Sequence, residues 1–137
     1  MAVIDNEVIT AIAPTAVGTS TINTAAIDMA GYDECTFVVR LGTPAANNNI
    51  RVQQDVASGG SYADLTGTLV SHATTNQLTV TVIRPGKQFL RCQITRGTST
   101  TIDTCVVIQR RFGGLFPVTQ PALSVNEVYV SPAEGTA

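Results

Sequence analysis

Short runs in which apolar and polar residues alternate limit the fold of this chain more than any other feature of its sequence. In Leu78–Ile83 and again in Phe89–Thr95 an apolar residue occupies every second position, which places the apolar side chains on one face of a β-strand. Threonine, valine and isoleucine recur throughout, and their branched Cβ atoms favour strands over helices. No window between residues 20 and 112 has the apolar spacing and caps of a helix. The sequence therefore predicts an all-β fold.

Glycine and proline divide these runs into short strands. The seven expected strands cover residues 19–28, 33–41, 49–56, 64–71, 77–83, 88–96 and 102–111. The run at 105–110 alternates less strictly than the others, as a central strand can. Short strands at this spacing predict an antiparallel β-sandwich or a jelly-roll-like barrel.

One of the expected turns has a specific chemistry. In Arg84–Lys87, proline and glycine occupy the two central positions. Proline presets φ at the first of these positions, and glycine tolerates the positive φ that a type II turn needs at the second. The pattern predicts a type II turn with Gly86 at positive φ.

Both ends of the chain differ from its middle, so we expect an N-terminal arm at 1–18, a β-sandwich domain at 19–112 and an extended C-terminal arm at 113–137. The last segment holds three of the six prolines, which disfavour sheet pairing. It also carries large apolar side chains: Leu115, Phe116, Leu123, Val125, Val128, Tyr129 and Val130. These features predict an arm that lies on another surface; the alternative is a tail folded back on its own domain.

Composition excludes several classes of protein. Only 13% of the 137 residues are charged, while 44% are hydrophobic, a balance that argues against disorder. No apolar stretch reaches the roughly 18 residues of a membrane span, and residues 1–7 lack the pattern of a secretory signal. A net charge of −2 argues against binding to nucleic acid. We expect a soluble globular protein, made in the cytosol, with no membrane or nucleic-acid partner.

The residues that carry chemistry do not form a catalytic or metal-binding motif. Cys35, Cys92 and Cys105 have no paired spacing, and we expect buried free thiols. His72 is the only histidine and follows a strand-like run, so we interpret it as a strand-end residue. The acids of the middle region flank expected strands and turns, which is typical of solvated side chains. The sequence therefore predicts no enzyme, no cofactor and no metal site.

Charge is distributed unevenly along the chain. Residues 1–34 carry five acids and no base, whereas six of the eight bases lie at or after position 84. Such polarity suits steering toward a partner or self-assembly; the alternative is solvated strand faces. The candidate partner-binding residues are the four bases Arg84, Lys87, Arg110 and Arg111 and the apolar residues Leu115, Phe116, Leu123, Val125, Val128 and Tyr129.

Three segments resemble one family of proteins. They are Gly31–Val39, Ser61–Gly67 and Lys87–Thr95, the last following a proline–glycine turn. They are similar to small all-β head decoration proteins of tailed bacteriophages and prophages, also called auxiliary capsid or cement proteins. The resemblance covers about residues 19–112 and implies no catalytic residues. The long C-terminal segment departs from it.

The resemblance implies a structural role. We expect a capsid decoration subunit on the outer surface of the virion head, with the major capsid protein as its partner and a homo-oligomeric state, trimer favoured over dimer. The alternatives are another phage structural subunit (a head–tail connector, a tail or a fibre-associated protein) and a non-catalytic carbohydrate-binding module. The last alternative needs an exposed aromatic platform, and the sequence offers no tryptophan and only three tyrosines for it.

Overall fold

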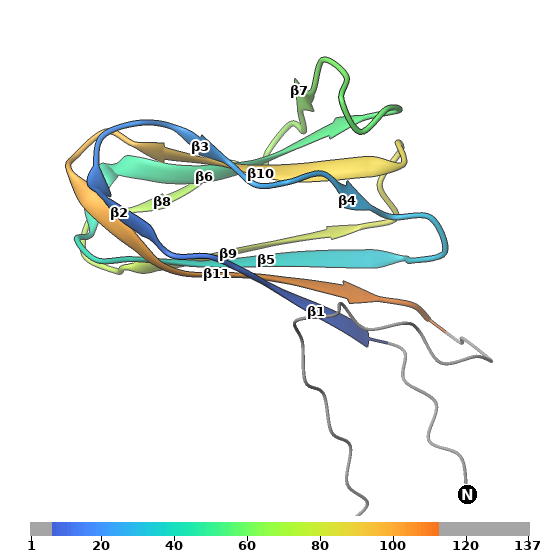
Figure 1. The fold of residues 1–137 in the computed structure, drawn as a ribbon, viewed down its shortest axis with the longest axis horizontal. Coiled ribbons are helices and arrows are strands. Elements are labelled where there is room, and N and C mark those ends of the chain that lie inside the picture. The colour runs from blue at the N-terminus through green and yellow to red at the C-terminus, as the bar shows by residue number, and fades with distance from the viewer. Residues whose placement is uncertain (1–6, 113–137) are drawn as a thin grey trace, which may run out of the picture.

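The computed structural model describes residues 7–112 as eleven β-strands in two stacked layers (Figure 1). The strands are β1 (Glu7–Ile12), β2 (Thr15–Gly18), β3 (Ile22–Asn23), β4 (Ile27–Asp28), β5 (Glu34–Leu41), β6 (Ala45–Asp55), β7 (Ala63–Asp64), β8 (Val70–His72), β9 (Gln77–Ile83), β10 (Phe89–Arg96) and β11 (Thr100–Arg110). None of the described residues lies in a helix that could cross a membrane. The prediction of an all-β sandwich is confirmed.

The strand order is that of a jelly roll. Sheet A has the order β1-β11-β5-β9, with β2 also pairing with β11. Sheet B has the order β3-β10-β6-β7, with β4 pairing with β10 and β8 with β6. All of these pairings are antiparallel. When the short neighbours β1/β2, β3/β4 and β7/β8 are each counted as one strand, the chain passes to the other sheet at every connection except that from β6 to β7, which both lie in sheet B, as in a jelly roll.

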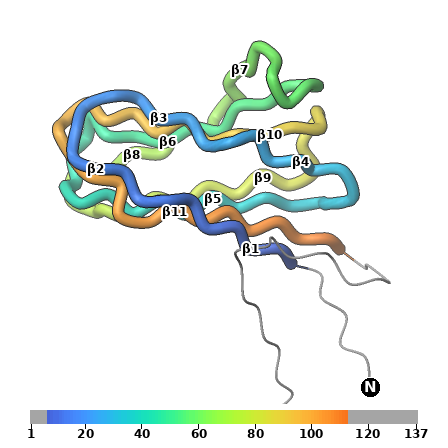
Figure 2. Tube along the Cα trace, viewed as in Figure 1, coloured from blue at the N-terminus to red at the C-terminus, as the bar shows by residue number. Residues whose placement is uncertain are grey.

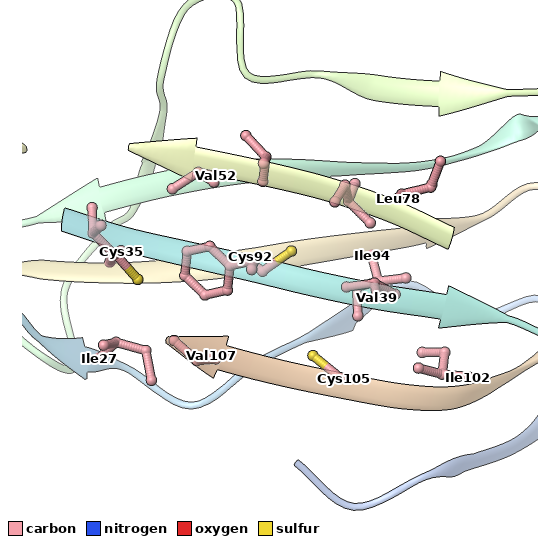
Figure 3. Close-up of a cluster of buried hydrophobic side chains, with 14 of the residues drawn as sticks. Ile27, Cys35, Val39, Val52, Leu78, Cys92, Ile94, Ile102, Cys105 and Val107 are labelled. Atoms are coloured by element: carbon pink, nitrogen blue, oxygen red, sulfur yellow. The ribbon is translucent and has the colours of Figure 1, made fainter. Parts of the chain in front are cut away.

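The core lies between the two sheets (Figure 3). Phe37 and Val39 on β5 and Leu90 and Cys92 on β10 have no exposed surface. They occupy the inward positions of the alternating runs, as the sequence predicts for β10. Burial of each large apolar side chain contributes about 1.5–3 kcal/mol before the entropy cost of ordering. The two-residue period of β5 and β10 therefore accounts for the stacking of the sheets.

Residues 7–18 differ from the predicted N-terminal arm. β1 pairs residue by residue with β11 from Glu7↔Arg110 to Ile12↔Cys105, and β2 pairs with the start of β11. Val8 is buried. These residues form one edge of sheet A, because β11 would otherwise leave an unpaired row of backbone groups there. The predicted arm at 113–137 lies outside the described residues.

Two expected strands are interrupted. In place of one strand at 19–28, β3 and β4 are separated at Thr24, whose hydroxyl accepts a hydrogen bond from the Cys92 backbone N–H at 2.9 Å. In place of one strand at 64–71, β7 and β8 are separated by a turn in which the Thr68 hydroxyl donates to the Leu65 carbonyl at 2.8 Å. In both cases a threonine side chain takes over a backbone hydrogen bond.

The turn between β9 and β10 differs from the prediction. Gly86 does not have a positive φ; Arg84 does, with φ at 50°. The type II turn predicted at Gly86 is therefore wrong. The chain reversal instead places Arg84 in the left-handed region, which non-glycine residues rarely adopt, and the Arg84 N–H donates to the Asp33 carbonyl at 2.6 Å.

A buried arginine joins the two sheets at one end of the sandwich. Arg96, 3% exposed, ends β10. Its guanidinium donates to the carbonyls of Ala16 at 2.8 Å, Ser20 at 2.8 Å and Thr100 at 3.0 Å, and to the Ser20 hydroxyl at 2.6 Å. The described residues give it no carboxylate partner. The fork geometry of the guanidinium satisfies several backbone acceptors together.

We expect the Arg96→Lys variant to lose about 2–4 kcal/mol of unfolding free energy, because an ammonium group cannot reach the same set of acceptors and leaves buried carbonyls unsatisfied. Urea denaturation measures the loss. Arg40→Lys is the matched control, since Arg40 is exposed on β5, and it should change stability by less than about 0.5 kcal/mol. Equal effects of the two substitutions would contradict the role assigned to Arg96.

The glycines give a second comparison. Gly31 has a φ of 83° and open space where a Cβ would project, whereas a Cβ at Gly86 would meet only Gln54, at 3.9 Å, and would need no positive φ. We expect Gly31→Ala to cost about 1–2 kcal/mol and Gly86→Ala to be neutral or to stabilise by about 0.4–1 kcal/mol. Melting temperatures of the two variants check this, and a larger loss at Gly86 would be the contrary result.

Candidate partner-binding surfaces

An open cleft of about 440 Å³ lies between the β4–β5 and β9–β10 connections, which meet at the same end of the sandwich (Figure 1). Its lining residues are Met29, Ala30, Tyr32, Asp33, Arg84, Pro85, Gly86, Lys87 and Gln88. Its volume falls within the ~300–1,000 Å³ range of ligand pockets. The jelly-roll topology forms this cleft, because it brings two connections far apart in sequence to one end.

Hydrogen bonds fix the two walls of the cleft relative to each other. The Met29 N–H donates to the Gln88 carbonyl at 2.8 Å, and the Gln88 side-chain amide donates to the Asp28 carboxylate at 3.0 Å. On the other side of the cleft, Asp33 accepts from the Arg84 N–H through its backbone carbonyl. The Asp33 carboxylate also accepts the Phe112 N–H at 2.8 Å. The cleft is thus tied to the end of the described chain.

Two predicted partner-binding residues meet in this cleft. Arg84 is exposed and Lys87 is partly exposed. Neither forms an ion pair within the described part of the chain, in contrast to Arg51 and Arg110. The cleft lining carries these two cations and one carboxylate, that of Asp33, and the excess of positive charge favours an anionic partner group.

Arg110 occupies a different surface, the outer face of sheet A. It lies on β11 between Glu7 on β1 and Glu34 on β5, with ion-pair distances of 2.7 and 3.3 Å. The hydrogen bond to Glu7 and the charges of both acids raise the pKa of Arg110 above its ordinary value. Its charge is already balanced by two acids of the N-terminal region, so sheet pairing brings together charges that are separated along the sequence.

Of the remaining predicted residues, only Arg111 belongs to the described part of the chain. Arg111 follows β11 and is partly buried. The six apolar candidates Leu115, Phe116, Leu123, Val125, Val128 and Tyr129 lie outside the described residues.

The outer face of sheet A is largely apolar in its middle, away from the charged residues Glu7, Arg110 and Glu34 that lie side by side at one end. Val106 on β11 is opposite Val38 on β5, and Ile108 is opposite Thr36. The Thr36 hydroxyl, on a buried residue, shares a 2.9 Å hydrogen bond with the hydroxyl of the exposed Thr81 on β9, so these two polar groups satisfy each other. An antiparallel sheet with one face in water ordinarily alternates apolar and polar residues. The weak alternation of residues 105–110 was the sequence signal for this face.

The outer face of sheet B has the opposite character. The Arg91 guanidinium lies 4.3 Å from the centre of the Tyr62 ring and donates to the Gln53 side chain at 2.8 Å. Gln53 donates in turn to the Asp64 carboxylate at 2.7 Å, which also pairs with Arg51 at 3.0 Å. The hydrogen bonds from Gln53 and Arg51 lower the pKa of Asp64. Sequence reasoning missed this network, because its members come from three separate strands and a loop.

The cysteines and His72 are placed as the sequence predicts. All three cysteines are buried and free. Burial raises the pKa of Cys35 to about 12, with a contribution from Glu34, and that of Cys105 to about 11; it also raises the pKa of Cys92. His72 is an exposed residue at the end of β8, and its Nδ1 accepts the Thr75 N–H at 3.2 Å. Residues 7–112 contain no group of three or more His, Cys, Asp or Glu side chains placed to hold a metal ion.

We expect a thiol reagent to label the native protein slowly at pH 8 and rapidly in denaturant, because the thiolate is the reactive form and burial disfavours it at all three cysteines. Absorbance of the released chromophore follows the reaction. A Thr104→Cys variant provides the control, since Thr104 is exposed and its thiol should react quickly in the native state. Native labelling of the wild type at the control rate would contradict the assigned burial.

No protein-family model matches the chain, and a search of curated proteins also finds no match. Among solved structures, the chain is similar to the crystal structure of the SPBc2 prophage-derived protein YomS. The two are 17% identical, the alignment covers 80% of this chain and 98% of the YomS chain, and the TM-score is 0.48. The functional inferences for this chain therefore depend on its own surfaces.

Proposed function

We propose that this chain is a non-catalytic structural subunit of a tailed-phage virion, a decoration or cement protein that binds the outer surface of the head and stabilises the major capsid shell. The observation that carries the proposal is the cleft in which Arg84 and Lys87 lie together without an ion-pair partner among the described residues. Fold alone does not imply function, so the support comes from this surface and from the resemblance of residues 19–112 to decoration proteins.

The cleft suits recognition of a protein surface. Hydrogen bonds between the two connections hold its walls in place, so little ordering is needed when a partner binds. Complementary charges raise the association rate and select the partner more than they raise affinity. An acidic side chain or acidic loop of the major capsid protein would supply the missing negative charge.

The oligomeric state is also part of the proposal. A homo-oligomer, with a trimer favoured over a dimer, would present several copies of the cleft to the shell, and linked copies bind far more tightly than one. The apolar outer face of sheet A, where Val38, Val106 and Ile108 are half-buried and Ile83 is exposed, supports self-association, because apolar surface patches commonly mark protein contacts.

Another structural role in a phage particle would fit the same surface, and the position of the protein on the particle distinguishes that role from capsid decoration. A head–tail connector, tail or fibre-associated subunit would also need a rigid, charged docking site. The carbohydrate-binding alternative has less support: Arg91 covers one face of the Tyr62 ring, and Tyr32 packs against the core.

The test is co-sedimentation with purified heads of the phage or prophage that carries the gene, together with averaged images of the particles. We expect wild-type protein to bind heads, and Lys87→Glu to weaken binding by about tenfold or more because it places a negative charge in the cleft. Binding should also weaken as salt is raised.

Arg40→Glu is the matched control for this experiment. It makes the same charge change at an exposed position near the end of β5, about 20 Å along the strand from its start beside Asp33, and it should bind heads like the wild type. Equal binding by both variants would remove the role of the cleft. Density for the protein on tails instead of heads would favour the other structural role.

A further inference from the structure

Strand β9 forms an open edge of sheet A. It pairs with β5 on one side, and within residues 7–112 no strand pairs with it on the other. Its register with β5 runs without a shift from Gln77↔Arg40 to Ile83↔Glu34. Figure 2 shows that β7 and its neighbouring loop stand on the sheet B side of the sandwich, away from sheet A. A strand edge of this kind presents a row of backbone donors and acceptors to a further strand.

The hydrogen bonds at the two ends of β9 show which backbone groups point to the open side. The Asn76 carbonyl accepts the Leu41 N–H at 2.7 Å, and the Arg84 N–H donates to the Asp33 carbonyl at 2.6 Å. Because hydrogen-bonded positions alternate in an antiparallel pair, the even-numbered residues of β9 bond to β5. The backbone groups of the odd-numbered residues therefore point to the open side. These residues are Gln77, Thr79, Thr81 and Ile83, and their side chains are exposed.

The other sheet edges in the described part of the chain carry features that oppose strand pairing. In sheet B, the edge strands β3, β4, β7 and β8 have only two or three residues each. At the other edge of sheet A, Pro14 separates β1 from β2, and β1 begins with the charged residue Glu7. Short strands, prolines and charges protect edges from unwanted partners. β9 is seven residues long and contains neither a proline nor a charge, so it lacks these protections.

The sequence of β9 is complementary to a second copy of itself. In an antiparallel pair of two β9 strands centred on Val80, Thr79 of each copy lies opposite Thr81 of the other, and Gln77 lies opposite Ile83. Every pair joins residues whose backbone groups point to the open side, so the two strands exchange roughly eight hydrogen bonds. Threonine pairs stabilise neighbouring strands, and β9 has no charge that would face its own copy. One register thus satisfies the whole edge, which favours a second copy as the occupant.

We propose that two copies of this chain pair antiparallel along β9, across a two-fold axis at Val80, and so join their A sheets into one continuous sheet. A two-fold contact closes on itself. By itself it gives a dimer, and combined with the trimer favoured above it joins two trimers, so the assembly contains an even number of copies. The inference goes beyond the proposed function, and its test needs no phage particles.

The experiment measures the native mass of the purified full chain by size exclusion with light scattering. We expect the wild type to associate into an even number of copies at about 0.1 mM, a concentration suited to a small contact held by main-chain hydrogen bonds. A double variant, Gln77→Lys with Ile83→Lys, places like charges opposite each other at both ends of the β9 pair. It should weaken self-association by about tenfold or more.

A charge-swapped partner and a matched control make the test specific to this register. The double variant Gln77→Glu with Ile83→Glu should also associate weakly alone, but its equimolar mixture with the lysine variant should restore association, because opposite charges then meet. Restoration also shows that both variants are folded. Val17→Lys with Val56→Lys is the control: it adds the same charge at exposed positions outside β9 and should associate like the wild type.

A wild-type chain that stays monomeric at this concentration, or that forms only a trimer, would overturn the proposal. A monomer is also the result expected if the chain's own C-terminal segment or a strand of another protein occupies the edge. Undiminished association of the lysine variant, or a mixture that fails to restore association, would equally reject this contact. Failure of head binding with intact β9 pairing would instead reject the proposed function and leave the pairing in place.

Discussion

Mutual burial of the inner faces of the two sheets is the constraint on which the rest of this structure depends. Phe37, Val39, Leu90 and Cys92 have no exposed surface, and they sit at alternate positions of the central strands. Because a strand has a two-residue period, burying these side chains also determines which residues face outward. The apolar outer face of sheet A and the polar outer face of sheet B follow from the same registers that form the core.

Two buried polar side chains of the core region, Arg96 and Thr24, are hydrogen-bonded to backbone groups. Alternation along β10 brings Arg96 inward after Leu90, Cys92 and Ile94, and backbone carbonyls from three segments receive its hydrogen bonds. Thr24 similarly accepts the Cys92 N–H where β3 gives way to β4. A buried polar group without a partner is costly, so these contacts determine where edge strands begin, end and cross between the sheets.

The surfaces proposed for function are consequences of this framework. The cleft exists because the jelly-roll path returns the β4–β5 and β9–β10 connections to one end, and a 2.6 Å hydrogen bond from Arg84 to Asp33 fixes their spacing. Arg110 belongs to the same base-rich C-terminal part of the sequence as Arg84, but its charge is already balanced by ion pairs with Glu7 and Glu34. Sheet pairing therefore separates Arg110, which is paired with acids, from Arg84 and Lys87, which have no ion-pair partner among the described residues.

The sequence by itself determined the fold class, the inward face of β10 and the buried state of the cysteines, because these depend on local alternation and on the preferences of β-branched residues. Tertiary structure alone decided the place of residues 7–18 at the edge of sheet A, the positive φ at Arg84 in place of Gly86, and the Tyr62–Arg91–Gln53–Asp64 network. Each of these depends on a partner distant in sequence: β11 for β1, Asp33 for Arg84, and three strands for the network. The alternation of apolar and polar residues within a strand carries no information about which strand will lie beside it. The neighbouring strand decides which polar side chains are paired and which remain available for binding.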